Sequence, residues 1–223
     1  MTPADGQLIV FTLGAAAMAV LVSFPAALAL AWALARKRWP GKTLVETLLT
    51  LPLVMPPVAT GLVLLKLFGR RGPLGAWLHQ TFGIDVVFTP KAVVLALAVM
   101  SFPLLVRCLR TAFEEIPRDL EEAAATLGKT PRQVFCRVSL PLARRGLAAG
   151  LILAFARALG EFGATVMVAG LIPGVTETLP LAIYRSFQTG DDSRAWMLAG
   201  ISALIAFAAV VISGWFARGK RLL

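Results

Sequence analysis

The sequence alternates long uncharged runs with short, mostly basic segments. Leu8 to Ala35 contains 28 residues without a charge, and a helix needs about 20 apolar residues to cross the hydrocarbon core of a membrane. We expect five membrane-spanning helices within the following runs: Leu8 to Ala35, Thr47 to Leu65, Ala92 to Val106, Gly146 to Ala169 and Ala195 to Ala217. The pattern therefore predicts an all-α integral membrane protein.

Three of these runs are irregular. Pro52, Pro56 and Pro57 interrupt the second run, and each proline removes a helical hydrogen bond that lipid cannot replace. We expect that span to be kinked and packed against protein. The third run has only 15 uncharged residues, so its helix should extend into residues 86 to 90. The fourth run carries two charges near its middle.

Composition supports a membrane protein and excludes an ordinary soluble domain. Hydrophobic residues make up 58% of the 223 residues, charged residues only 15%, and the mean hydropathy is +0.79. The net charge of +10 does not indicate a nucleic-acid partner, because the basic residues lie between apolar runs and form no continuous face.

Basic residues also predict the orientation, because short loops rich in Lys and Arg stay in the cytoplasm. Most of them fall after the first span, between the third and fourth spans, and after the last span. These are Arg36, Lys37, Arg38, Lys42, Arg107, Arg110, Arg118, Lys129, Arg132, Arg137, Arg144, Arg145, Arg218, Lys220 and Arg221. With five spans the N-terminus should lie outside and the C-terminus in the cytoplasm.

Nothing in the sequence marks a second domain, so residues 1–223 are expected to form a single membrane domain. The sequence does not decide whether a sixth helix, short or re-entrant, is also present. Cys108 and Cys136 fall in the basic central stretch, where thiols stay reduced, and no disulfide is expected. The segment Met1 to Gln7 lacks the features of a cleaved signal, so it should remain attached to the first helix.

The basic stretch at residues 116–141 should form two short helices. Pro117 suits a first helical position, Gly128 suits a left-handed stop, and Thr130 followed by Pro131 suits the start of a second helix. Small and apolar side chains recur on one face of the first helix: Leu120, Ala123, Ala124 and Leu127. An exposed face of this kind favours docking of another protein, although a helix pair lying on the bilayer is the simpler alternative.

The same stretch resembles the EAA loop of binding-protein-dependent ABC importer permeases. The similarity rests on Glu122-Ala123-Ala124, three residues, Gly128, nine residues, and then Val138 to Pro141. In that family the loop lies in a cleft of the ATPase subunit and couples it to the membrane helices. The resemblance implies six coupling residues: Glu122, Ala123, Ala124, Gly128, Leu140 and Pro141.

Further segments are similar to molybdate permeases of this family, with sulfate, thiosulfate or tungstate as alternative substrates. They are Leu51 to Pro57, Gly69 to Gly72, Ser101 to Arg107, Phe155 to Thr165, Ile172 to Gly174 and Leu179 to Pro180. The resemblance implies a homodimer in the bacterial inner membrane, two ATPase subunits, and a periplasmic or lipid-anchored oxyanion-binding protein. Five spans also leave little material to surround a polar path, which favours a dimer.

The sequence predicts no enzymatic activity, cofactor or metal site in this chain. Two Gly-Lys-Thr triplets, at residues 41–43 and 128–130, lack the earlier glycine of a phosphate-binding loop. His79 has no second ligand at metal-binding spacing. An intramembrane enzyme using Arg157 and Glu161 is a remote alternative, because it would lack a convergent set of catalytic groups.

Five polar residues within the spans are candidates for the transport path. Arg157 and Glu161 are four residues apart, and they could form a structural ion pair or line the path. A tetrahedral dianion would need hydroxyl or backbone donors in a hydrated constriction. Thr60, Ser101 and Thr165 could supply hydroxyls, or could bond back to their own helices.

Overall fold

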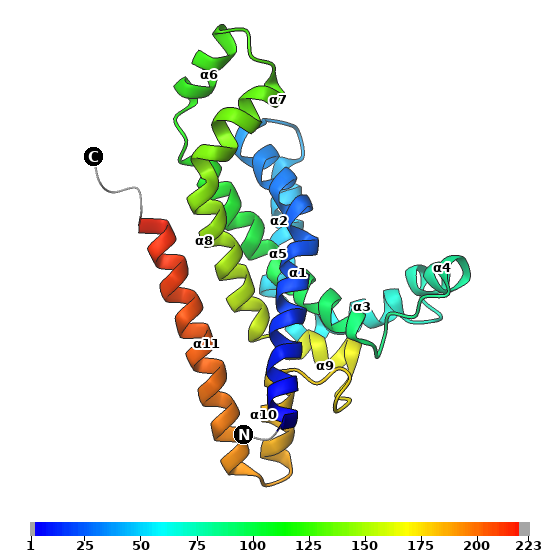
Figure 1. Cartoon of the computed structure of the whole chain (residues 1–223). Helices are drawn as coiled ribbons and strands as arrows, with labels where there is room; N and C mark the ends of the chain where they lie inside the picture. Colours follow the sequence, from blue (N-terminus) through cyan, green and yellow to red (C-terminus); the bar gives the residue numbers. More distant parts are fainter. Residues whose placement is uncertain (1–2, 219–223) are drawn as a thin grey trace.

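The chain folds into a bundle of long helices with shorter helices at its ends and side (Figure 1). The structure is a computed structural model that describes residues 3–218. Its elements are α1 (Pro3–Arg36), α2 (Lys42–Val54), α3 (Pro57–Phe68), α4 (Pro73–Phe82), α5 (Pro90–Glu114), α6 (Arg118–Thr126), α7 (Pro131–Val134), the π-helical segment η1 (Phe135–Ser139), α8 (Leu140–Leu159), α9 (Gly163–Ala169), α10 (Leu179–Gln188) and α11 (Asp192–Arg218). No strand occurs within the described residues.

Four helical stretches are long and apolar enough to cross a membrane, namely Pro3–Arg36, Pro90–Glu114, Pro131–Leu159 and Asp192–Ala217. The pair α2 and α3 passes the same test together, with a bend of 110° between its halves. Counting that pair as one broken span gives five. The all-α integral membrane fold is therefore confirmed.

The predicted kink in the second span is confirmed, and it lies between the two helices. Pro52 remains inside α2, whereas Met55 and Pro56 adopt extended conformations and Pro57 starts α3. Proline suits a first helical position because its missing N–H is not needed there. Helix α3 shows the expected packing and buries Thr60, Gly61 and Leu64. Helix α2 has no fully buried residue, but its partly buried Leu49 packs against an apolar cluster of the bundle.

The predicted extension of the third span into residues 86 to 90 is wrong except for Pro90, because α5 begins at Pro90 and residues 86–89 are not helical. The helix gains its length at the other end, where it continues to Glu114. The fourth predicted span, Gly146 to Ala169, is wrong as a single helix. Helix α8 ends at Leu159, and a separate helix α9 starts at Gly163. The Glu161 carboxylate accepts a hydrogen bond from the backbone N–H of Ala164 at 2.9 Å. Such capping satisfies a free donor at the new helix start and stabilises the break.

Close packing in the bundle depends on small residues. Cβ atoms built at Gly146 and Gly150 would lie 2.6 and 2.9 Å from the Cβ atoms of Ala112 and Cys108. Because such distances do not occur between real Cβ atoms, α8 can approach α5 this closely only with glycine at these positions. The buried residues Ala27, Ala31 and Leu34 of α1 belong to one apolar cluster with Leu105 and Leu109 of α5.

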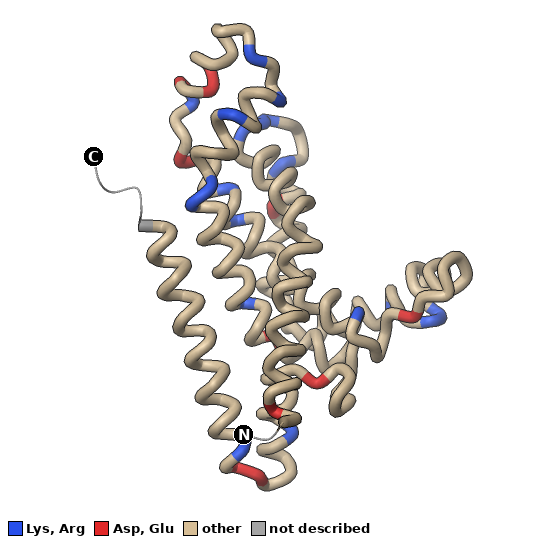
Figure 2. Tube along the Cα trace, viewed as in Figure 1, with Lys and Arg blue, Asp and Glu red and all other residues tan. Residues whose placement is uncertain are grey.

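Charged residues concentrate toward the ends of the bundle. Figure 2 shows Lys and Arg gathered around α6, α7 and the adjoining helix ends, with few charges along the long helices. This agrees with the loop positions on which the predicted orientation depends. Lys220 and Arg221, which contributed to that prediction, lie outside the described residues.

Helix α4 projects from the side of the bundle (Figure 1). Its base is held by Arg70, which donates two hydrogen bonds to Asp85 at 3.1 and 2.9 Å. These hydrogen bonds lower the pKa of the Asp85 carboxyl. The Nδ1 atom of His79 lies 3.2 Å from the same carboxylate.

Candidate functional site

The loop at residues 116–141 has most of the predicted local structure. Helix α6 begins at Arg118, so Pro117 immediately precedes the helix and is not its first residue. Gly128 has a φ of +80°, as expected for a left-handed stop. Thr130 caps α7 reciprocally with Gln133, in a capping box followed by Pro131.

The sequence predicted that the second helix of this loop is short and separate, and this prediction is wrong. Residues Pro131–Leu159 form one helical stretch, in which α7 continues through η1 into α8. At the join, the N–H of Leu140 donates to the carbonyl of Phe135, five residues earlier. Pro141 is the second residue of α8 and donates no backbone hydrogen bond to this continuous stretch, and the π-helical segment lies immediately before it. Helix α7 is therefore continuous with a helix that is long and apolar enough to cross a membrane.

The outer face of α6 is an exposed apolar surface. Leu120 and Leu127 are 48% and 81% exposed, Ala123 is exposed, and Ala124 is partly buried. Together these four residues form what we call the α6 face. No residue of α6 is buried. A helix without buried residues has no apolar anchor within this chain, so the α6 face is free to meet another protein.

The two neighbouring acids of α6 have different environments. Glu122 is exposed and lies at the edge of a hollow of about 430 Å³ under α6. Its helical position is therefore away from the α6 face, although the sequence interpretation placed it beside that face. Glu121, which was not predicted as a site residue, points into the chain and makes specific bonds.

Glu121 joins three segments of the protein. Its carboxylate lies 3.0 Å from Arg36 Nε at the end of α1, and it accepts a hydrogen bond of 2.6 Å from Ser139 Oγ. Arg36 also donates to the carbonyl of Ile116 at 3.0 Å. We call Arg36, Glu121 and Ser139 the Glu121 clamp. The sequence shows that Arg36 ends an apolar run and so lies at the end of a span. It does not show that Arg36 pairs with Glu121, because the two residues are 85 positions apart and share no local motif.

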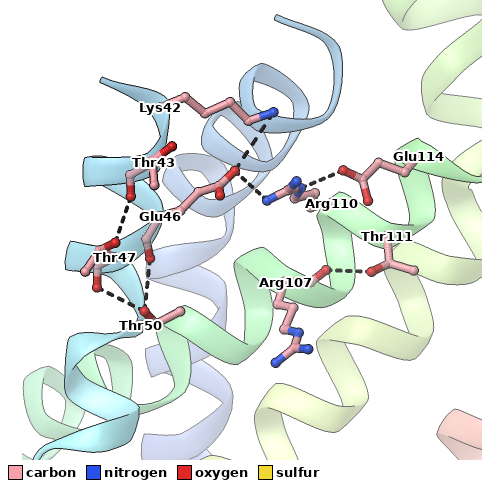
Figure 3. A network of polar contacts seen from close by, with 9 residues as sticks. All are labelled: Lys42, Thr43, Glu46, Thr47, Thr50, Arg107, Arg110, Thr111 and Glu114. Atoms are coloured by element: carbon pink, nitrogen blue, oxygen red, sulfur yellow. Dashed lines mark hydrogen bonds and ion pairs between the residues drawn. The ribbon is translucent and has the colours of Figure 1, made fainter. Parts of the chain in front are cut away.

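A second polar network joins α2 to α5 near the same end of the bundle (Figure 3). The Glu46 carboxylate accepts a hydrogen bond from Arg110 Nη1 at 2.7 Å, and Lys42 Nζ lies 3.9 Å from it. Arg110 also donates to Glu114 at 2.6 Å. Helix α2 has no buried residue, so these charged contacts fix its first turns against α5.

The remaining coupling candidates lie at the root of α8. Leu140 is partly buried and packs against the apolar cluster that contains Ala143 and Leu147. Pro141 is exposed. The structure thus places Glu122, Ala123, Ala124 and Gly128 in the projecting part of the loop, and Leu140 and Pro141 where it enters the bundle.

Arg157 and Glu161 form an ion pair, with Arg157 Nη1 at 3.0 Å from Glu161 Oε2. They do not share one helix, because α8 ends at Leu159. The Glu161 side chain is 2% exposed, whereas that of Arg157 is 31% exposed. The Glu161 carboxylate also accepts the hydrogen bond from the Ala164 N–H in the first turn of α9. The pair therefore fixes the break between α8 and α9, with the arginine reaching an open surface.

The three hydroxyl candidates behave differently. The Ser101 hydroxyl donates to the carbonyl of Leu97 at 2.7 Å, which is the alternative of bonding back to its own helix. Thr60 and Thr165 are buried, and their hydroxyls have no hydrogen-bond partner among the described residues. They lie on α3 and α9, which pack together where Gly61 meets Ala164 and Met167.

Two further buried acids were not predicted from the sequence. Glu177 is 6% exposed and lies 2.7 Å from Arg185, and Asp5 lies 2.9 Å from Arg194. In the fold, the Arg194 pair ties the start of α11 to the start of α1.

These features define a membrane protein with a projecting helical loop that enters a transmembrane helix directly. The chain matches the family described as binding-protein-dependent transport system inner membrane component over residues 8–222, and it belongs to that family. It is an inner-membrane transport component by this membership.

Within this family, the chain is similar to permease proteins of molybdenum and sulfate transport systems. The chain is 46% identical over 222 residues to the molybdenum transport system permease protein ModB of Escherichia coli K12, covering 99% of this chain and 97% of the relative. It is 42% identical over 208 residues to ModB of Haemophilus influenzae, covering 93% and 91%. The sulfate transport system permease protein CysT of E. coli K12 is 40% identical over 195 residues, covering 86% and 70%.

A solved structure supports the fold independently. The MetNI methionine ABC transporter, in inward-facing conformations, contains a chain that matches with a TM-score of 0.68 at 20% identity. The match covers 98% of this chain and 100% of that chain. At this identity the likeness establishes the fold alone.

Proposed function

We propose that this chain is the permease subunit of a molybdate ABC importer. The observation that carries the proposal is the combination of an unpartnered α6 face, the left-handed Gly128 and a second loop helix continuous with α8. The ModB relatives, which are similar over nearly their full length, favour molybdate over sulfate. Tungstate has the same tetrahedral form and charge, so it should share the path.

The proposed complex places two copies of this chain in the inner membrane. Two ATPase subunits bind the coupling loops on the cytoplasmic side, and an oxyanion-binding protein delivers substrate from the periplasmic side. ATP is bound and hydrolysed by the ATPase subunits alone. Because α7 continues into α8, closure of the ATPases is transmitted to the bundle and alternately opens the path to each side.

Uptake by the reconstituted complex tests the proposed substrate. The permease, its ATPase and its binding protein should import radioactive molybdate, with unlabelled tungstate competing about equally and sulfate about ten-fold less strongly or weaker. Vesicles lacking ATP, or containing a catalytically inactive ATPase, provide the controls. ATP-dependent import of sulfate with no import of molybdate would assign the chain to the sulfate alternative.

Cys136 tests the proposed orientation. Its side chain is exposed in η1, within the loop at residues 116–141, whereas Cys108 is partly buried in α5. In a Cys108→Ala variant, a membrane-impermeant thiol reagent should label Cys136 in inside-out vesicles and leave intact cells unlabelled. A Cys108→Ala/Cys136→Ser variant corrects for background. Labelling in intact cells would place the loop outside and contradict the assigned cytoplasmic side.

A further inference from the structure

Helix α6 stands off from the helices that it would have to move. The hollow of about 430 Å³ lies between α6, the end of α1 and the α7–η1 segment, and is lined by Trp32, Arg36, Glu121, Val134 and Phe135 among others. Tightly packed side chains transmit displacement, but a void leaves its lining atoms without partners on one side. Packing alone therefore links α6 weakly to the bundle.

The Glu121 clamp crosses this gap. Apart from the bonds of Glu121 to Arg36 and Ser139, no side chain of α6 has a hydrogen bond or ion pair to α1, α7, η1 or α8 within residues 3–217. The side chains of Arg36 and Glu121 are only 10% and 17% exposed. Charge-assisted bonds in partly buried positions are stronger than exposed ones and strongly oriented.

Both anchors of the clamp belong to the transmembrane bundle. Arg36 is the last residue of α1, whose buried residues Ala31 and Leu34 pack in one cluster with Leu105 and Leu109 of α5. Ser139 is 1% exposed and immediately precedes α8. A force on α6 therefore reaches α1 and α8 through Glu121, in addition to the path along the chain through Gly128.

We infer that Arg36, Glu121 and Ser139 are positioning residues that transmit movement of the coupling helix α6 to α1 and α8. The inference rests on the proposed function, in which an ATPase moves α6. It divides the adjacent acids by role: Glu121 fastens the loop to the membrane helices, whereas Glu122 is exposed at the edge of the hollow. Loss of the clamp should uncouple ATP hydrolysis from transport without preventing assembly.

The test measures molybdate imported per ATP hydrolysed in vesicles containing the complete complex. Arg36→Ala and Glu121→Ala should each lower this ratio about ten-fold, as expected when one charge-assisted hydrogen-bond system is lost. Co-purification of the ATPase should remain within about two-fold of the unmodified complex, because the α6 face is untouched. Asp119→Ala is the matched control, since Asp119 is an exposed acid of the same helix.

The double variant Arg36→Ala/Glu121→Ala separates a shared bond from two independent roles. If both residues act through the clamp, the double variant should import as much molybdate per ATP as the more impaired of the two single variants. A further multiplication of the loss, or an unchanged import ratio in both single variants, would overturn the inference. If the unmodified complex itself fails to couple ATP hydrolysis to import, the proposed function fails instead.

Discussion

Replacing Gly128 by valine should lower molybdate uptake about ten-fold or more, while the chain remains folded and inserted. Gly128 has a φ of +80° between α6 and α7, and a Cβ built there would meet no atom within 4 Å. The cost is therefore conformational and not steric crowding by neighbours. A left-handed conformation costs an L-residue about 1–2 kcal/mol and is especially poor for β-branched side chains. The measurement is uptake by cells at matched membrane expression.

Gly128→Asn is the control for that variant. Asparagine adopts the left-handed region far more readily than valine, so uptake should remain within about three-fold of the unmodified protein. The ATPase should co-purify poorly with the valine variant, because the relative direction of α6 and α7 has changed. Equal uptake by the valine and asparagine variants would show that the turn at Gly128 does not control docking.

Replacing Glu161 by alanine should destabilise the protein strongly, by on the order of 2 kcal/mol. Two contacts are lost together, the ion pair with Arg157 and the hydrogen bond to the Ala164 N–H. Arg157 would then be left without its partner, although its 31% exposure reduces the penalty relative to a fully buried charge. Thermal unfolding in detergent and protein level in membranes measure the effect.

Two further variants distinguish the ion pair from the helix cap. Glu161→Gln removes the charge but keeps a carbonyl oxygen that can accept from Ala164, so it should lose less stability than Glu161→Ala. Arg157→Met/Glu161→Gln should be at least as stable as Glu161→Gln, because no unpaired charge remains. Equal losses of uptake in single and double variants at normal protein levels would instead support a direct role in the transport path.

The spans and the loop could be predicted from sequence because their causes are local. An uncharged run such as Leu8 to Ala35 is long enough to span a membrane as a helix, and α1 covers this run. Gly128, Thr130 and Pro131 specify a turn and a helix start through backbone φ, side-chain capping and a missing N–H. These properties do not depend on partners elsewhere in the chain.

Helix breaks were predicted less well, because hydrophobicity does not distinguish a continuous helix from two packed segments. The run from Gly146 to Ala169 reads as one span, but the Glu161 carboxylate satisfies the start of α9 and allows the chain to turn. The small residue Gly163 then lets α9 approach Pro57 and Val58 at the start of α3. Tertiary contacts between α3 and α9 favour the break over a straight helix.

Apolar runs, basic loops and turn residues were thus sufficient, from the sequence by itself, to determine an all-α membrane protein with a projecting loop. Only the tertiary structure decided which charged side chains form ion pairs with each other. Glu121 and Glu122 are adjacent and chemically alike, yet only Glu121 meets Arg36 and Ser139. Asp5 likewise pairs with Arg194, which is 189 residues away. The physical reason is that an ion pair requires proximity of about 4 Å, and helix packing alone determines that proximity between distant segments.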